Sequence, residues 1–159
     1  MCFQTADLCD EFPDRVKAAD PIFKNYGTKT KFCGEIVTLK IHEDNVLVKQ
    51  RLTENGNGKV LVVDGGGSMR CALVGDILAK SAVDNGWAGI VVYGCIRDSA
   101  MINTMNIGIK ALNTHPLKSP KHGRGDKDIP VNFAGVSFHV GHYLYADEDG
   151  VIVSDAKLK

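Results

Sequence analysis

The sequence lacks a net charge and lacks any long apolar run. Its 159 residues carry 19 Lys and Arg against 19 Asp and Glu, so no overall field drives the chain onto nucleic acid or anionic lipid. No apolar stretch approaches the roughly 20 residues that a membrane helix needs. The first residues also lack the basic and then apolar pattern of a secretory signal. These absences predict a cytoplasmic protein with no membrane partner and no direct nucleic-acid partner.

Metal-binding and nucleophilic motifs are scarce as well. No CxxC pair occurs, so a zinc site of the usual spacing is not expected. The five cysteines are widely spaced within apolar segments, and we interpret them as small buried hydrophobic residues of a reducing compartment. The five histidines form no HxH or HxxxH pair, which favours scattered structural roles. No Gly-Lys-Ser/Thr run is present, so the chain has no phosphate-binding P-loop.

What is present is an ordinary globular composition, with 44% hydrophobic and 24% charged residues. A chain of this length can bury one substantial core, so residues 1–159 are expected to form a single domain. Basic residues gather in the polar loop 118–128, at Lys118, Lys121, Arg124 and Lys127. A solvated loop is the favoured interpretation of this run, with a local basic patch as the alternative.

Two continuous apolar runs define the centre of the predicted fold. Residues 59–63 and 88–93 are rich in β-branched side chains, which is typical of strands buried on both faces of a parallel sheet. Glycine-containing segments stop both runs, at 64–67 and at Gly94. A helix is predicted between them, over residues 76–85. Together these segments predict a β-α-β unit.

The flanking segments add short helices and further strands. Thr5 and Asn45 are expected to cap helices, the second of which buries Val48 and Leu52 on one face. Apolar patterns predict strands over 35–41, 107–112, 131–133, 136–140 and 151–153, with a hairpin turn at 149–150. The expected fold class is α/β, a mixed sheet flanked by a few helices, with a central β-α-β unit and a β-rich C-terminal part.

The carboxyl ends of the two central strands lie at one edge of the predicted sheet. In a right-handed β-α-β crossover the start of the helix lies at that edge too, and ligands of open α/β sheets bind there. The segments brought to this edge are 64–67, 75–78 and 94–98. The twenty residues between Asp76 and Arg97 make up one helix and one strand, so these two side chains are expected to lie close together.

The groups at this edge suit an anionic ligand and a hard cation. Backbone N–H groups of residues 75–78 form a helix N-terminus that attracts a carboxylate, and Arg97 adds a planar, permanently charged fork. Asp76 and Asp98 offer oxygen ligands to Mg²⁺ or Mn²⁺, which often takes only one or two protein carboxylates. The alternatives are structural: a helix cap for Asp76, a surface ion pair between Arg97 and Asp98, and a simple turn for the glycines.

The Asp-Gly-Gly-Gly run at 64–67 faintly resembles the loop of a nucleotide or S-adenosylmethionine site. The next strand ends in Tyr93-Gly94, with no acidic residue to hold a ribose hydroxyl. We therefore do not expect a nucleotide at this loop.

Six stretches carry a resemblance that spans nearly the whole chain: TADLCD at 5–10, PIFKNYG at 21–27, EDNVLV at 43–48, VLVVDGGGS at 60–68, NGWAGIVV at 85–92 and YLYADEDG at 143–150. On these stretches the chain resembles the family of regulator of ribonuclease activity A and the class II 4-hydroxy-4-methyl-2-oxoglutarate aldolases. The resemblance implies a swivelling β/β/α fold and a ring-shaped homotrimer with sites between neighbouring subunits.

The aldolase branch of this family is marked by an Asp, twenty residues, an Arg-Asp pair, two residues and then an acid. Asp76, Arg97 and Asp98 match this pattern, whereas Met101 stands at the final acidic position. The resemblance implies that Asp98 holds Mg²⁺ or Mn²⁺ and that Asp76 and Arg97 are catalytic. It also implies that the substrate is bound by Arg97 and by Gly75, Asp76, Ile77 and Leu78. The family acid acts on the metal through water, and losing such a partner commonly costs roughly 10- to 100-fold in affinity or activity.

The activity implied by the resemblance is metal-dependent cleavage of a small 2-oxo acid, 4-hydroxy-4-methyl-2-oxoglutarate, to two pyruvate. Oxaloacetate decarboxylation would pass through the same enolate. The alternative is a non-catalytic regulator that binds an endoribonuclease or RNA helicase and inhibits RNA processing. Met101 favours this alternative, whereas Asp98 favours the aldolase branch. An older label of the family, menaquinone methyltransferase, is a third reading and lacks the acidic ribose contact.

Overall fold

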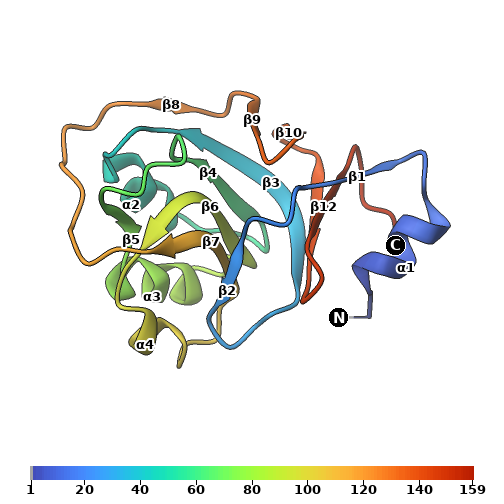
Figure 1. The fold of residues 1–159 in the computed structure, drawn as a ribbon, viewed down its shortest axis with the longest axis horizontal. Coiled ribbons are helices and arrows are strands. Elements are labelled where there is room, and N and C mark those ends of the chain that lie inside the picture. Colours follow the sequence, from blue (N-terminus) through green and yellow to red (C-terminus); the bar gives the residue numbers. More distant parts are fainter. Residues whose placement is uncertain (1) are drawn as a thin grey trace.

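A computed structural model describes residues 2–159 of the chain (Figure 1). Its helices are α1 (Thr5–Glu11), α2 (Val46–Leu52), α3 (Asp76–Asp84) and α4 (Ser99–Ile102). Its strands are β1 (Val16–Ala18), β2 (Lys24–Tyr26), β3 (Phe32–Lys40), β4 (Val60–Asp64), β5 (Ala72–Val74), β6 (Gly89–Ile96), β7 (Ile109–Thr114), β8 (Asp126–Lys127), β9 (Val131–Phe133), β10 (Val136–Phe138), β11 (Tyr143–Ala146) and β12 (Val151–Ser154). Among these residues no helix has the length and apolarity to cross a membrane.

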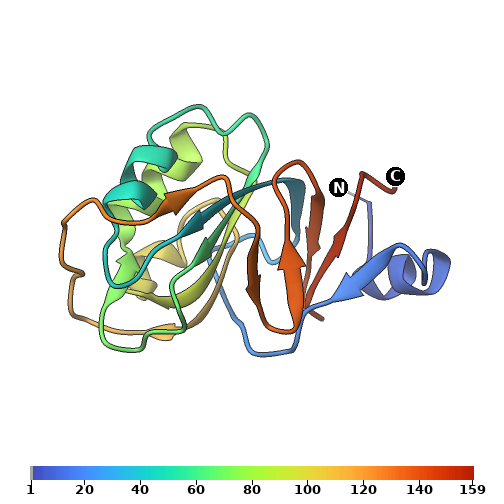
Figure 2. The ribbon, with the colours of Figure 1, turned by 90° about the horizontal axis from the view of Figure 1, so that it is seen from above.

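Ten of the strands form one mixed sheet. Its main path runs β1-β12-β11-β3-β4-β6-β7-β2, with β5 paired to β6 and β8 paired to β3. The central strands β3, β4, β6 and β7 are parallel to one another. The outer pairings of the main path, β1–β12, β12–β11, β11–β3 and β7–β2, are antiparallel. Figure 2 shows α2 and α3 together on one side of the parallel part and the β9–β10 hairpin elsewhere on the sheet. The predicted α/β class, with a mixed sheet and a β-rich C-terminal part, is confirmed.

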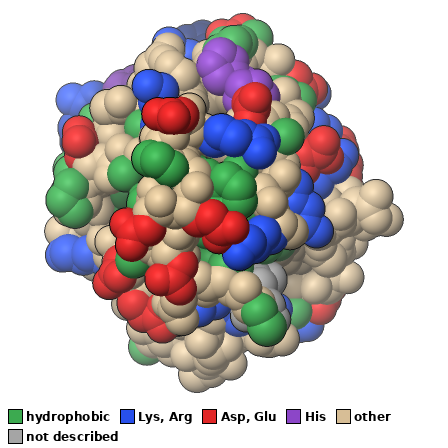
Figure 3. All heavy atoms as spheres, turned by 90° about the vertical axis from the view of Figure 1, so that its right-hand side faces the viewer, with side chains coloured by type: hydrophobic (Ala, Val, Ile, Leu, Met, Phe, Trp, Pro, Cys, Tyr) green, Lys and Arg blue, Asp and Glu red, His purple; other side chains and the backbone are tan. Residues whose placement is uncertain are grey.

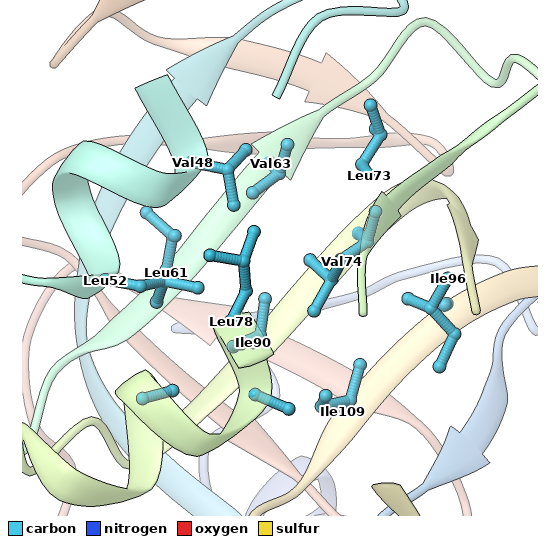
Figure 4. Close-up of a cluster of buried hydrophobic side chains, with 14 of the residues drawn as sticks. Val48, Leu52, Leu61, Val63, Leu73, Val74, Leu78, Ile90, Ile96 and Ile109 are labelled. Atoms are coloured by element: carbon cyan, nitrogen blue, oxygen red, sulfur yellow. The ribbon is translucent and has the colours of Figure 1, made fainter. Parts of the chain in front are cut away.

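Both faces of the central strands are buried, as their continuous apolarity predicted. One face packs against α2 and α3 (Figure 4) in a cluster that includes Val48, Leu52, Leu61, Val63, Leu78 and Ile90. The other face carries alternate residues of the same strands and packs against the β9–β10 hairpin, through Val60, Val62, Val91, Phe133 and Phe138. Each such side chain contributes about 1.5–3 kcal/mol when it leaves water. The two strands whose ends approach the candidate site, β5 and β6, both contribute buried side chains to the cluster that includes Val48 and Leu52.

One buried carboxylate fixes the N-terminal helix to the far end of the sheet. Asp147 is 1% exposed and accepts hydrogen bonds from the Thr5 N–H and the Thr5 hydroxyl, both at 2.7 Å. Gln4 occupies the N-cap position of α1 without a side-chain hydrogen bond. The prediction that Thr5 caps this helix is wrong, because the buried carboxylate takes its hydroxyl. Figure 3 views this end of the molecule, where exposed side chains of both charges surround small apolar areas.

The structure corrects the boundaries of the central unit. Gly94 does not end its strand, because β6 continues to Ile96. The continuation pairs with β5, a three-residue strand that the sequence analysis missed, and Val74 lies opposite Ile96. β5 is too short for a periodic pattern, and it follows a glycine-rich loop that suggested a direct passage into the helix. The strand β11 was also missed and forms the predicted hairpin with β12 around residues 149–150.

Burial of the cysteines is only partly as expected. Cys71 and Cys95 are buried, whereas Cys2 is exposed and the remaining two are half-buried. His139 and His142 lie side by side, with ring centroids 4.8 Å apart, so the histidines are not all scattered.

Candidate functional site

The candidate site begins where two parallel strands end side by side. Val74 at the end of β5 lies opposite Ile96 at the end of β6, and both side chains belong to the main core (Figure 4). The Arg97 N–H donates to the Val74 carbonyl at 2.9 Å, which extends the pairing by one residue. Asp76 and Arg97 therefore leave the sheet next to each other. The expected closeness is observed, but β5 produces it rather than the strand that ends at residue 64.

Asp98 lies directly across from the start of α3. Its Oδ2 atom accepts the Asp76 N–H at 3.0 Å. The residue has φ 58° and ψ 38°, a left-handed conformation that costs a non-glycine residue roughly 1–2 kcal/mol. This cost is tolerated because the conformation lets Asp98 turn back towards α3 while α4 begins at the following residue. Strained backbone of this kind is concentrated at functional sites.

The carboxyl group of Asp98 is held ionised. The backbone hydrogen bond from Asp76 is the main cause that lowers its pKa, and the Asp76 side chain and the positive charge of Arg97 act in the same direction. Desolvation opposes these effects but does not outweigh them. Asp98 thus presents a negatively charged oxygen ligand at the carboxyl edge of the sheet.

Arg97 makes no ion pair with Asp98 among the salt bridges of residues 2–159. Its Nη1 atom instead donates to the Pro116 carbonyl at 3.4 Å, in the loop that follows β7. This contact holds the guanidinium at the site without neutralising it. The remaining N–H groups of Arg97 are available to a carboxylate or an enolate oxygen.

The backbone donors of α3 are less free than the sequence suggested. The Asp76 N–H is engaged by Asp98, and the Ile77 N–H is engaged by the Oδ1 atom of Asp76 at 2.9 Å. A substrate carboxylate would therefore use Gly75 and Leu78, or compete for the other two donors. Gly75 is the N-cap residue of α3, and Leu78 anchors the first turn by its buried side chain.

A cavity of about 570 Å³ opens at this point. Its wall includes the six residues to which the family resemblance assigns catalysis, substrate binding or the metal. The other lining residues come from β5, from α2 with its two cap positions and from the loop after β7: Ala72, Asn45, Val46, Lys49, Gln50, Thr53, Lys118 and Lys121. The volume lies within the roughly 300–1,000 Å³ typical of small-molecule sites.

The glycine-rich segment 64–67 is not part of this cavity. A side chain at Gly66 would approach His42, and one at Gly67 would lie against the Tyr93 ring. Glu43 fastens the end of the same loop, because its Oε2 atom accepts both the Ser68 hydroxyl and the Arg70 Nε–H at 2.6 Å. The expectation that this loop contributes to the site is wrong, because none of its residues lines the cavity.

Sequence reasoning missed the α2 wall of the cavity. Asn45 occupies the N-cap position of α2, as expected, but its side chain makes no capping bond. Its amide donates to the Leu73 carbonyl at 3.1 Å, and its Oδ1 atom accepts the Lys121 ammonium group at 2.8 Å. The spacing of Asn45, Lys49 and Thr53, each four residues apart, was the available signal for a polar helix face.

The donor set fits one hard divalent cation. No group of three or more His, Cys, Asp or Glu residues suited to a metal exists in residues 2–159. Asp98 and Asp76 are the only carboxylates that line the cavity. Mg²⁺ is commonly held by one or two carboxylates, with water and substrate in its other positions, so this pair is sufficient. Met101, on α4, is 54% exposed and adds no ligand.

Comparison with known proteins shows the family of the chain. A family model described as "RraA-like: Aldolase/RraA" matches residues 5–153. The chain belongs to the RraA-like family. A relative from Aromatoleum aromaticum is 62% identical over 99% of both chains, and one from Dechloromonas aromatica is 60% identical over 99% of both. Both relatives carry the name "Putative 4-hydroxy-4-methyl-2-oxoglutarate aldolase".

Solved structures of the RraA-like family show the same fold. The RNA-processing inhibitor RraA from Thermus thermophilis is 43% identical and has a TM-score of 0.96, with 100% of this chain and 96% of that chain covered. A Geobacillus kaustophilus structure titled as an S-adenosylmethionine:2-dimethylmenaquinone methyltransferase is 49% identical with a TM-score of 0.96, and 98% and 97% of the two chains are covered. The names of these relatives thus divide between an enzyme of 2-oxo acids, a regulator of RNA processing and a methyltransferase.

Proposed function

We propose that this RraA-like protein is a divalent-metal-dependent aldolase that cleaves 4-hydroxy-4-methyl-2-oxoglutarate to two pyruvate, with oxaloacetate decarboxylation as a side activity. The observation that carries the proposal is the hydrogen bond from the Asp76 N–H to Asp98, which gathers two carboxylates and Arg97 at the wall of one cavity. The names of the relatives at 62% and 60% identity support the same substrate.

Asp98 is the proposed ligand of the cation, with Asp76 beside it to hold a water molecule. When bound, Mg²⁺ or Mn²⁺ would act as a Lewis acid towards the 2-oxo group of the substrate. The low pKa of Asp98 supports this assignment, because a ligand must be deprotonated before it can bind a metal ion.

The remaining chemistry is assigned to residues of the chain. The Asp76 carboxylate accepts, through water, the proton of the substrate's 4-hydroxyl group. Cleavage of the C3–C4 bond then releases one pyruvate as a ketone, and the electron pair of that bond stays on the other fragment as an enolate. Arg97 stabilises the negative charge on the enolate oxygen, and solvent protonates the carbon to give the second pyruvate. Loss of CO₂ from oxaloacetate leaves the same enolate.

The direct test is a coupled assay of pyruvate release with purified protein and Mg²⁺ or Mn²⁺. We expect turnover of 4-hydroxy-4-methyl-2-oxoglutarate and slower turnover of oxaloacetate, both abolished by EDTA and restored by the metal. Arg97→Ala is expected to abolish turnover with its melting temperature unchanged, since the side chain is partly exposed and bonded only to Pro116. The proposal would be rejected if neither substrate gave pyruvate, or if the protein kept full activity in EDTA.

A second candidate function is inhibition of RNA processing through contact with an endoribonuclease or RNA helicase. The apolar, exposed Met101 beside the site and the 43% identity to the Thermus inhibitor favour it. An RNA cleavage assay with the purified nuclease, with and without the chain, tests this candidate. Inhibition by the Asp98→Ala variant as strong as that by the wild type would show a regulatory role that needs no catalysis.

We also propose that the chain assembles as a homotrimer with its sites between subunits. Three large apolar side chains on or next to the segments that line the cavity are exposed in the single chain. Ile77, at 74%, lines the cavity, Leu117, at 58%, precedes the lining residue Lys118, and Met101, at 54%, lies on the helix that follows Asp98. Exposed apolar residues that gather at one place commonly mark an interface. Light scattering of the purified protein measures its molar mass in solution, and a monomeric mass would contradict the trimer.

A further inference from the structure

We propose that Lys49, together with Lys118, recognises the distal carboxylate of the substrate and so selects dicarboxylate 2-oxo acids over monocarboxylates. This inference rests on the proposed function and names the substrate class of the same cavity. The relevant observation is that charge is unevenly distributed over the cavity wall. Four cationic side chains and two anionic side chains line it: Lys49, Arg97, Lys118 and Lys121, against Asp76 and Asp98.

The two kinds of charge come from different elements. Both carboxylates and Arg97 come from the turns that follow β5 and β6, where the chemistry is placed. Lys49 comes from α2, and Lys118 and Lys121 come from the loop after β7. When Arg97 holds the 2-oxo acid group of a ligand, the positive charge of the lysines on this part of the wall still has no negative partner. A second carboxylate on the same ligand would supply that negative charge.

Lys49 is placed at the cavity by the periodicity of α2. Val48 and Leu52, which flank Lys49 on that helix, are 0% exposed and fix the rotation of the helix about its axis. Asn45, Lys49 and Thr53 consequently share the face that lines the cavity. The Asn45 amide bonds to the Leu73 carbonyl and joins this face to β5, directly before the site.

Lys118 is placed by pairing of its backbone. The Ala72 N–H at the start of β5 donates to the Leu117 carbonyl at 2.8 Å, and Lys118 forms an isolated parallel bridge with Ala72. The loop therefore runs beside the start of β5, and Lys118 lies at the wall of the cavity. A backbone fixed in this way lowers the entropic cost of holding its ammonium group against a ligand.

Neither ammonium group is neutralised within the described chain. Arg51, two residues after Lys49, pairs with Glu54 and Asp128, each at 2.8 Å. No ion pair or side-chain hydrogen bond of residues 2–159 involves Lys49 or Lys118, whereas Lys121 is already engaged by Asn45. Lys49 and Lys118 are thus the cavity lysines that can bind a carboxylate without first losing a protein partner.

The test compares two non-cleavable ligands of equal chain length. 2-Oxoglutarate carries a second carboxylate, and 2-oxopentanoate carries a methyl group in its place. Calorimetry of the full chain with Mn²⁺ present is expected to show at least tenfold tighter binding of 2-oxoglutarate, because a hydrogen bond to a charged group contributes about 1.5–3 kcal/mol. Lys49→Gln is expected to remove most of this preference, and Lys49→Gln with Lys118→Gln all of it. The affinity for 2-oxopentanoate should not change.

A control variant separates a local effect from a general loss of positive charge. Lys80→Gln removes a lysine of α3 that pairs with Asp84 and does not line the cavity, so it should keep the full preference. An unchanged preference in the Lys49 and Lys118 variants, or equal binding of the two ligands by the wild type, would overturn this inference. The proposed function would be unaffected by either result. Binding of neither ligand by the metal-loaded wild type would reject the proposed function and this inference with it.

Discussion

The Oδ2 atom of Asp98 occupies the space that a side chain at Gly75 would need. A methyl group at residue 75 would stand 2.8 Å from that oxygen, and the side chain of Arg97 lies 3.5 Å from the same point. Such a contact is shorter than real Cβ atoms make, so either the carboxylate or the start of α3 would have to move. The two residues are separated by helix α3 and strand β6 in the chain, yet each sets the position of the other.

Gly75→Ala is therefore expected to reduce turnover about 100-fold, because an error of about 1 Å in the position of a catalytic group has that effect. The melting temperature should stay close to that of the wild type, since the site lies at the surface of the sheet edge. Gly94→Ala is the matched control. Its added methyl would lie 3.1 Å from a methyl group of Leu73, and neither residue lines the cavity. Equal loss of activity in both variants would contradict a specific role for Gly75.

Asp98→Asn is expected to abolish the metal dependence of turnover together with turnover itself. The amide keeps an oxygen that can accept the Asp76 N–H, so the local fold is retained while the negative charge is lost. Mn²⁺ binding, followed by calorimetry or by the paramagnetic relaxation of water, should weaken by at least about tenfold. Unaltered Mn²⁺ affinity in this variant would show that the cation is held elsewhere.

Met101→Glu is expected to strengthen the proposed metal site. Residue 101 lies on the helix α4 that starts directly after Asp98, and its side chain is 54% exposed. A carboxylate there can bind a water molecule of the cation, and such partners commonly account for roughly 10- to 100-fold in affinity or activity. Met101→Gln offers nearly the same shape without the charge. An increase in Mn²⁺ affinity for Glu and not for Gln is the expected result, and equal values for the two variants would contradict it.

Stability should fall in acid through Asp147. Burial tends to raise the pKa of its carboxyl, but hydrogen bonds from Thr5, Asp149 and Gly150 outweigh burial and keep the pKa below its usual value. A carboxyl whose pKa is lowered by folding stabilises the protein above its unfolded pKa of about 3.9, and this contribution is lost as the pH falls through the folded value.

Thr5→Ala is expected to reduce this contribution. Loss of the charge-assisted bond to Asp147 should lower the free energy of unfolding by about 1.5–3 kcal/mol at pH 7, and the difference from the wild type should shrink below about pH 4. Urea unfolding at several pH values measures both quantities. Thr53→Ala, at the exposed residue that follows α2, should leave the pH dependence unchanged. A difference that does not vary with pH would rule out this linkage.

The core of the fold was predictable because hydrophobic periodicity reports burial directly. The continuous apolar runs at residues 59–63 and 88–93 gave the central strands, and the segment after Gly75 gave α3. The predicted closeness of Asp76 and Arg97 is observed because a crossover helix returns the chain to the same edge. Its immediate cause, β5, has only three residues and therefore no period to detect.

What the sequence could not supply were contacts between distant segments. The glycine-rich loop satisfied the usual pattern of a ligand loop, yet it lies against His42 and Tyr93 and does not line the cavity. The engagement of the Asp76 N–H by Asp98 depends on the left-handed backbone of residue 98, which the sequence pattern did not predict. Lys118 and Lys121 looked like a solvated loop because nothing local ties them to α2.

Asn45 bonds at once to the Leu73 carbonyl and to the Lys121 ammonium group, so α2, β5 and the 116–124 loop share one side chain. Three stretches far apart in sequence should then open and close as a unit in native-state hydrogen exchange. Binding of a small anion to any one of these stretches should slow amide exchange in all three. Asn45→Ala should make their exchange rates independent of one another.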